Sequence, residues 1–169
     1  MQKLLLFRGP MGIGKSATAR ALGKRLGWPV VDKDDASDVL LKYLEVYGPA
    51  AYDIMFEQAE SLIMQGFNVI VDSPLRGEIG YKRALEFSQE LDFDLGIIDC
   101  TCTDQKTWQE RLETRTRRPA HILKTWADFE TYWAKAEADF DYPITSPCLT
   151  IDTRQELEQN INQIVNWLI

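Results

Sequence analysis

Residues 9–16, GPMGIGKS, follow directly on the short apolar run KLLLF at residues 3–7. Three glycines, a lysine and a serine therefore stand where a first strand would end. Two glycine-rich patterns fit this stretch and lead to different chemistry. Residues 12–17 satisfy the loose dinucleotide-binding form GxGxxA, and Asp32 follows Gly12 by 20 residues, at the distance of a ribose-binding acid. Residues 9–16 satisfy the longer pattern GxxxxGK(S/T), the phosphate-binding P-loop, in full.

The longer pattern predicts a P-loop. Its glycines let successive backbone N–H groups turn inward around a phosphate, and the helix that follows offers its positive N-terminal end. Lys15 would reach the β- and γ-phosphates and Ser16 would ligate Mg²⁺, whereas a dinucleotide site has no use for this pair. The residues expected to bind the nucleotide are Gly9, Met11, Gly12, Ile13, Gly14, Lys15, Ser16 and Ala17.

The composition predicts one globular domain over residues 1–169. The chain is 45% hydrophobic and 27% charged, and it has no apolar run long enough to span a bilayer. Arg8 and the glycines interrupt the first apolar run, so no signal peptide is expected. Three cysteines without metal-ligand spacing fit a reducing compartment, and we expect a cytoplasmic protein. The net charge of −7 disfavours nucleic acid as a partner; the oligomeric state stays open.

Short apolar runs alternate with longer amphipathic stretches along the chain. Five runs are typical of strands that are buried on both faces: residues 3–9, 28–32, 67–73, 94–101 and 147–152. Helices are expected over about 15–26, 36–47, 50–65, 77–91, 105–117, 123–139 and 154–168. This order predicts an α/β fold with a parallel sheet and helices on both faces. Ligands bind such sheets at the carboxyl ends of the strands, so polar residues there should converge.

Acidic residues follow the second and third expected strands. Asp32 and Asp34 lie two apart in VVDKDD and can face one site together, where they could serve an acceptor hydroxyl or Mg²⁺. Both Asp34 and Asp35 could instead cap the next helix. Asp72 ends the run NVIVD, which has the form of a Walker B strand, and would hold Mg²⁺ through water or cap a helix.

A basic segment, WQERLETRTRRPAHI, covers residues 108–122. At helical spacing Arg111, Arg115 and Arg118 share one face while Arg117 points away. Arginines in a mobile lid would neutralise a phosphoryl group during transfer and exclude water. The alternative is a solvated helix face on which these arginines pair with neighbouring glutamates.

Three further features allow two interpretations each. Arg76 would lie over the same edge of the sheet and could bind a polar or anionic substrate, or it could be a surface arginine. His121, the only histidine, has no partner nearby in the sequence, and a non-catalytic role is expected. An aromatic stripe at helical spacing could be core or a shelf for a substrate, with core preferred: Phe129, Trp133, Ala136 and Phe140.

The motifs GPMGIGKS, VVDKD, GFNVIVDS and RLETRTRRP together resemble the small-metabolite kinases of the P-loop superfamily. These include the shikimate, gluconate and adenylylsulfate kinases and the AAA-domain kinases such as chloramphenicol phosphotransferase and zeta toxin. The resemblance covers residues 1 to about 120 and implies a P-loop NTPase fold with five strands in the order 2-3-1-4-5 and a lid at about 111–125. It implies ATP at the P-loop, and roles for five more residues: Asp34 as substrate-orienting base, Asp32 and Asp72 near Mg²⁺, Arg111 against adenine, and Arg118 on the phosphates.

The sequence departs from shikimate kinases at two places. SPLRGEIGY stands where they carry a glycine triplet, and an acidic, aromatic stretch at 126–143 replaces the arginine that would hold the shikimate carboxylate. A different acceptor is therefore expected. The leading hypothesis is an ATP- and Mg²⁺-dependent kinase of a small hydroxylated molecule, with catalytic residues Lys15, Asp34, Arg115 and Arg118. The alternatives are a nucleotide-binding switch that hydrolyses ATP slowly and a kinase of nucleic-acid ends, which the acidic composition disfavours.

Overall fold

The computed structural model describes all residues from Met1 to Ile169. Strands and helices alternate along the chain, with a short 3₁₀ helix, η1, after the sixth helix. The elements in order are β1 (Lys3–Arg8), α1 (Lys15–Leu26), β2 (Val30–Asp32), α2 (Lys33–Leu40), α3 (Gly48–Met64), β3 (Val69–Asp72), α4 (Glu78–Glu90), β4 (Asp94–Thr101), α5 (Gln105–Thr114), α6 (Trp126–Ala136), η1 (Glu137–Phe140), β5 (Cys148–Asp152) and α7 (Leu157–Leu168).

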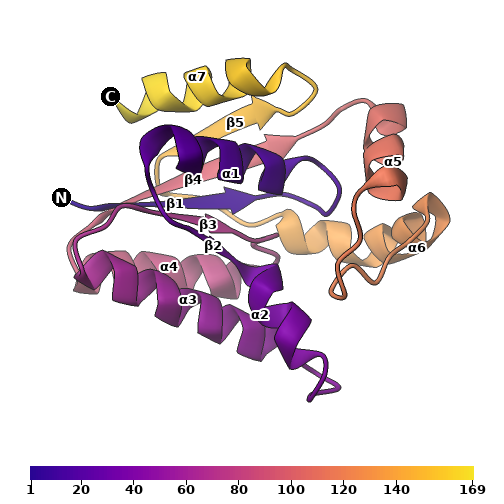
Figure 1. Cartoon of the computed structure of the whole chain (residues 1–169), viewed down its shortest axis with the longest axis horizontal. Coiled ribbons are helices and arrows are strands. Elements are labelled where there is room, and N and C mark those ends of the chain that lie inside the picture. The colour runs from indigo at the N-terminus through magenta and orange to yellow at the C-terminus, as the bar shows by residue number, and fades with distance from the viewer.

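The five strands form one parallel sheet in the order β2-β3-β1-β4-β5. The predicted α/β class and strand order are confirmed, and they are those of a P-loop NTPase fold. Parallel pairing brings the carboxyl ends of β1, β2 and β3 to the same edge, where Asp32 and Phe7 are both in register with Asp72. The loop between β1 and α1 leaves the sheet at this edge, beside α5 (Figure 1).

Helices cover both faces of the sheet, with α1 and α7 on one face and α3 and α4 on the other (Figure 1). Alternate residues of β1 belong to two different cores, because successive side chains of a strand point to opposite faces. Leu4 and Leu6 pack into the core that includes α3 and α4. Leu5 and Phe7 pack into the core that includes α1 and α7. None of the helices has the length and apolar character needed to cross a membrane.

Several helix boundaries differ from the prediction, and side-chain caps explain two of the differences. α2 begins at Lys33 because the Asp32 carboxylate accepts a hydrogen bond from the N–H of Asp34, and it ends seven residues earlier than predicted, at Leu40 rather than at residue 47. α6 begins three residues later than predicted because Thr125 forms a capping box with Asp128. α5 ends at Thr114 rather than at residue 117. The segment after α5, residues 115–125, is therefore a loop, which we call the lid loop.

Candidate active site

The glycine loop between β1 and α1 has a backbone that other residues would adopt with difficulty. Gly9, Gly12 and Gly14 have φ angles of +135°, +77° and +112°. A Cβ atom on Gly12 would lie 2.8 Å from Leu112 Cδ1, and one on Gly9 would lie 2.7 Å from the carbonyl oxygen of Cys100. α1 begins after Gly14 with no side-chain cap and no acidic residue in its first turn. Its first N–H groups are therefore free to bind an anion.

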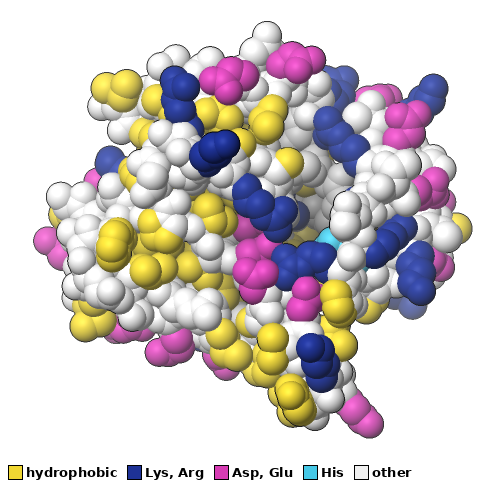
Figure 2. Space-filling model, in the orientation of Figure 1, with side chains coloured by type: hydrophobic (Ala, Val, Ile, Leu, Met, Phe, Trp, Pro, Cys, Tyr) yellow, Lys and Arg dark blue, Asp and Glu magenta, His cyan; other side chains and the backbone are white.

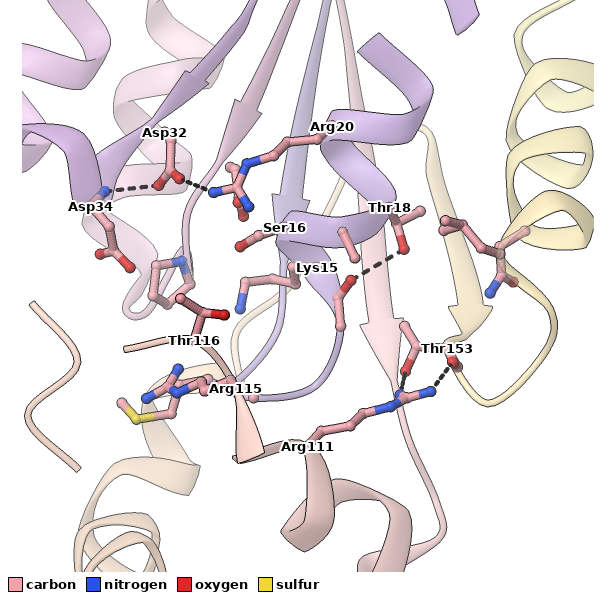
Figure 3. A pocket seen from close by; sticks show the side chains of 18 of the residues that line it. Lys15, Ser16, Thr18, Arg20, Asp32, Asp34, Arg111, Arg115, Thr116 and Thr153 are labelled. Atoms are coloured by element: carbon pink, nitrogen blue, oxygen red, sulfur yellow. Dashed lines mark hydrogen bonds and ion pairs between the residues drawn. The ribbon is translucent and has the colours of Figure 1, made fainter. Parts of the chain in front are cut away.

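Lys15 lies beneath the loop with 7% of its surface exposed, and its Nζ donates a hydrogen bond to the carbonyl oxygen of Pro10 at 2.8 Å. Burial lowers the pKa of Lys15, and the nearby charge of Asp72 opposes that shift. The Lys15 side chain points into the space in front of the loop (Figure 3). A buried cation with few competing partners is suited to binding a phosphate.

Asp72, at the end of β3, is only 3% exposed, and its Oδ2 atom has no hydrogen-bond partner. Burial raises the pKa of Asp72, while the charge of Lys15 and a contact with Ser16 lower it. The chain has no cluster of three or more acidic, His or Cys residues that could hold a metal unaided. An unpartnered carboxylate oxygen beside a serine hydroxyl nevertheless fits Mg²⁺, which takes one or two protein oxygens and completes its shell with phosphates and water.

These groups lie in one cleft of about 790 Å³ at the carboxyl edge of the sheet. Figure 2 shows a hollow here that is bordered by Lys, Arg, Asp and Glu side chains. Most of the predicted site residues line the cleft: Met11, Gly12, Gly14, Lys15, Ser16, Ala17, Asp32, Asp34, Asp72, Arg111, Arg115 and Arg118. Gly9, Ile13 and Arg76 do not line it. Ile13 is 3% exposed and packs into the core, so Gly9 and Ile13 shape the loop from behind.

Asp32 is already surrounded by donors. Its Oδ1 accepts from the N–H of Asp34 and its Oδ2 accepts from Arg20, each at 2.9 Å (Figure 3). Oδ2 also accepts from Arg118 at 2.9 Å. The carboxylate is 9% exposed and pairs with two guanidinium groups. Asp32 is therefore less available to Mg²⁺ than Asp72, whose Oδ2 has no partner.

Asp34 faces the cleft with a less crowded carboxylate, whose side chain is 32% exposed. Its Oδ1 lies 3.4 Å from Lys33 Nζ, and its Oδ2 lies 3.6 Å from His121 Nε2. Burial alone would raise the pKa of Asp34, but His121 and the positive charge of Lys33 together hold it well below its usual range. Asp34 is therefore an ionised carboxylate at the cleft wall, opposite Lys15 (Figure 3).

The three arginines of the basic segment reach the cleft from different structural positions. Arg111 is in the last turn of α5, Arg115 is the C-cap residue, and Arg118 is in the lid loop. The prediction that they share one helix face is wrong, because the helix ends before two of them. No ion pair joins them to the glutamates of α5, so the alternative of a solvated, paired face is also wrong. Arg117 points elsewhere and donates to the carbonyl oxygens of Leu123 and Lys124.

Arg111 is fixed at the end of the cleft near β5 and α7. Its NH1 donates to Thr153 Oγ1 at 3.0 Å and its NH2 donates to the Thr153 carbonyl oxygen at 2.7 Å (Figure 3). Arg115, by contrast, has a buried Nε without a partner, and its pKa is lowered by burial and by the charge of Arg117. Arg118 makes ion pairs with three carboxylates of β2 and α2, at 2.9, 2.6 and 2.8 Å: Asp32, Asp35 and Asp38.

Arg76 does not lie over the nucleotide cleft. Its Nε is 2.5 Å from Asp139 Oδ2, and its NH1 donates to the Tyr132 hydroxyl at 3.0 Å. These contacts join the loop after β3 to α6 and η1, and they occupy the charge that substrate binding would need. The prediction that Arg76 overhangs the cleft is therefore wrong.

The aromatic stripe of α6 is part of a packed cluster. Phe129 is 1% exposed and contacts Trp108 and Trp133 with ring centroids 4.8 and 5.6 Å apart. Trp108 also donates its indole N–H to the Met11 carbonyl oxygen at 2.9 Å. No aromatic residue of α6 lines the cleft. The preferred interpretation as core is confirmed, and the cluster supports the glycine loop through Trp108.

His121 and Thr153 are cleft residues that sequence reasoning missed. His121 lines the cleft beside Asp34, from which it is separated by 87 positions, so no local pattern could have indicated the contact. Thr153 follows β5 and holds both Ile13 and Arg111 through its hydroxyl. Thr153 directly follows the predicted strand at 147–152, and because ligands bind at the carboxyl ends of parallel strands, this position could have indicated a cleft residue.

Comparisons with known proteins agree with this architecture. A model of the AAA domain family matches residues 4–137. A provisionally assigned kinase from Chloroflexus aurantiacus is 21% identical, with a TM-score of 0.78 over 98% of this chain and 97% of its own. A sugar kinase from a Janibacter species is 13% identical, with a TM-score of 0.71 over 99% and 95% of the two chains.

The adenylylsulfate (APS) kinase CysC of Mycobacterium tuberculosis, in complex with AMPPNP and APS, is 16% identical. Its TM-score is 0.68 over 99% of this chain and 97% of that chain. A search of curated proteins finds no relative that matches by sequence. At these identities the structural likeness establishes the P-loop NTPase fold and leaves the substrate open.

Proposed function

The chain belongs to the AAA domain family, and from that premise we propose that it is a kinase that transfers the γ-phosphoryl group of ATP to a hydroxyl of a small molecule. The observation that carries this proposal is the ionised carboxylate of Asp34, which lines the same cleft as Lys15 and Ser16. A nucleotide switch needs the phosphate-binding loop but has no need of a carboxylate facing an acceptor.

The nucleotide would occupy the side of the cleft formed by the glycine loop and the loop after β5. Free N–H groups at the start of α1 and the buried cation of Lys15 support binding of its phosphates. The guanidinium of Arg111, fixed by Thr153, supports a contact with the adenine ring. The neighbouring APS kinase, which binds AMPPNP, is consistent with this use of the fold.

Ser16 and Asp72 would hold Mg²⁺, which when bound would neutralise phosphate charge. The acceptor oxygen forms a bond to the γ-phosphorus, and the bond from that phosphorus to the bridging oxygen breaks, so its electron pair leaves with ADP. Asp34 orients the acceptor hydroxyl and takes its proton. Lys15 and Arg115 face the phosphoryl group and stabilise its charge in the transition state.

The acceptor is proposed to be a small hydroxylated metabolite. The structural neighbours include a sugar kinase and an APS kinase, whose acceptors differ, so the fold does not choose among them. The net charge of −7 argues against a nucleic-acid acceptor. Three free cysteines fit a protein that works in the reducing cytoplasm.

The test is ATP consumption with Mg²⁺ in the presence of sugars, polyols, aminoglycosides, nucleosides, shikimate or gluconate, each compared with the rate without acceptor. If the protein is a kinase, one class of acceptor clearly raises the rate of ATP consumption. Asp34→Asn should then lower this acceptor-stimulated rate roughly 100-fold. Uniform slow hydrolysis that Asp34→Asn leaves unchanged would instead indicate a switch or an ATPase. Asp53→Asn, an exposed carboxylate on α3, is the matched control.

A further inference from the structure

We propose that His121 is a positioning residue that aligns the Asp34 carboxylate, and that it does so only while the lid loop is seated on α2. The proposal rests on the proposed function, because Asp34 acts there on the acceptor hydroxyl. It assigns a role to the single histidine of the chain, for which the sequence offers no partner.

The two ring nitrogens of His121 have different neighbours. Nδ1 accepts a hydrogen bond from the backbone N–H of Arg118 at 3.2 Å, so Nδ1 carries no proton in this arrangement. A neutral imidazole must then carry its proton on Nε2, and Nε2 lies 3.6 Å from Asp34 Oδ2. The backbone of the lid loop thus selects the tautomer that points an N–H toward the carboxylate.

The second oxygen of Asp34 is held from its own helix. Lys33 Nζ lies 3.4 Å from Oδ1, but it also donates to Ser37 Oγ at 3.0 Å and lies over the ring of Tyr52. Lys33 is therefore shared among several groups and fixes the carboxylate loosely. The other group beside the Asp34 carboxylate is His121, whose side chain is 15% exposed. It comes from the lid loop, whereas Lys33 belongs to α2 itself.

The lid loop reaches Asp34 because α2 binds it. The Arg118 guanidinium pairs with Asp32, Asp35 and Asp38, and the N–H of Ala120 donates to Asp38 Oδ1 at 2.7 Å. Both anchors lie within three residues of His121. If the lid loop left α2, the imidazole would leave Asp34 at the same time. Seating of the lid and alignment of the carboxylate are therefore one event. Figure 2 shows the histidine at the edge of the hollow, among basic and acidic side chains.

The contact can be tested first without any substrate, because a single histidine gives one set of imidazole ¹⁵N signals. The wild-type spectrum should show Nε2 protonated and Nδ1 as an acceptor. Asp34→Asn should shift the Nε2 signal, and Asp38→Ala, which loosens the seat of the lid, should move both nitrogens toward the values of a free histidine. Asp53→Asn is the control on α3 and should change nothing. A tautomer mixture in the wild type, or a spectrum indifferent to Asp34→Asn, would overturn the proposal whatever the activity of the protein.

Kinetics then separate positioning from packing, using the compound of the acceptor panel that raises turnover most. His121→Gln can place an amide N–H near the position of Nε2, whereas His121→Asn can replace only the acceptor at Nδ1. We expect kcat to fall about tenfold in His121→Asn and to recover largely in His121→Gln, while KM for ATP changes less than about twofold. Equal loss in both variants, or a change confined to KM for ATP, would assign His121 to packing of the lid loop. If no compound raises turnover, the proposed function fails while the spectrum still decides the contact.

Discussion

The two sides of the cleft are built in opposite ways. On the side of the glycine loop, which we call the phosphate side, Lys15 and Asp72 are buried. Burial lowers the pKa of Lys15 and raises that of Asp72, so it favours the uncharged form of each, and Asp72 Oδ2 has no hydrogen-bond partner. On the lid side, Arg118 already pairs with three carboxylates, and Asp34 is held in its charged form. The phosphate side leaves a buried carboxylate oxygen of Asp72 without a partner, whereas on the lid side Arg118 and Asp34 face charged partners within the protein.

This difference indicates what each side contributes. Unsatisfied, buried groups cost stability in the free protein and give a ligand more to gain, so the phosphate side is prepared for binding. Arg118 divides its guanidinium among three carboxylates, of which Asp35 is 73% exposed and in contact with water, so the lid side is suited to movement. Variants that affect one side only can test whether this division holds.

The largest effect is expected from Lys15→Ala on the phosphate side. The variant removes the buried cation beside the glycine loop, and we expect turnover of ATP to fall roughly 1,000-fold. Steady-state ATP consumption measures the loss. Lys24→Ala, at the exposed end of the same helix, should retain the wild-type rate. Comparable activity in the two variants would mean that the phosphates bind elsewhere.

Gly12→Ala tests how much of the phosphate side depends on backbone shape. Its Cβ would sit 2.8 Å from Leu112 Cδ1 at a φ of +77°, and we expect a loss of about 3 kcal/mol in the free energy of unfolding. Gly27→Ala is a close control, because Gly27 has a φ of +68° with no atom within 4 Å of the added Cβ. It should lose only about 1 kcal/mol, from the left-handed backbone alone. Urea unfolding of both variants gives the difference in stability. Equal losses would show that the contact of the added Cβ with Leu112 does not contribute to the loss.

The sequence was most informative where the site is local and least informative where it is assembled across the fold. The glycine loop, α1 and β4 follow from contiguous patterns, and the structure has the last two at the predicted residues. The end of α5 was missed because its last residues have no cap signal. The pairings of Arg118 with Asp38 and of Arg76 with Asp139 join segments 80 and 63 positions apart, and periodicity carries no information at that separation.

On the lid side, Arg118→Ala should loosen the lid loop without unfolding the protein. The amide of Ala120, which donates to Asp38, should exchange its hydrogen about tenfold faster. Native-state hydrogen exchange measures this rate. Arg83→Ala removes a guanidinium that pairs with Asp53 and Glu57 on α3, and it should leave that amide unchanged. Unaltered exchange in Arg118→Ala would show that the lid loop is held by contacts other than these ion pairs.

The smallest effect, and the most direct test of the contrast, is the dependence of stability on pH. The pKa of Asp72 is raised in the folded protein, so its contribution is fully present below its unfolded pKa and is lost as pH rises through the folded pKa. The pKa of Asp34 is lowered, so its contribution is present above its unfolded pKa and is lost as pH falls through the folded one. The stability of the wild type relative to Asp72→Asn should therefore fall as pH rises above about 4, whereas its stability relative to Asp34→Asn should fall as pH drops below about 4 and stay level above it. Unfolding of the three proteins in urea between acid and neutral pH gives both slopes, and slopes of the same sign would show that the two sides of the cleft do not differ in the way their charges are satisfied.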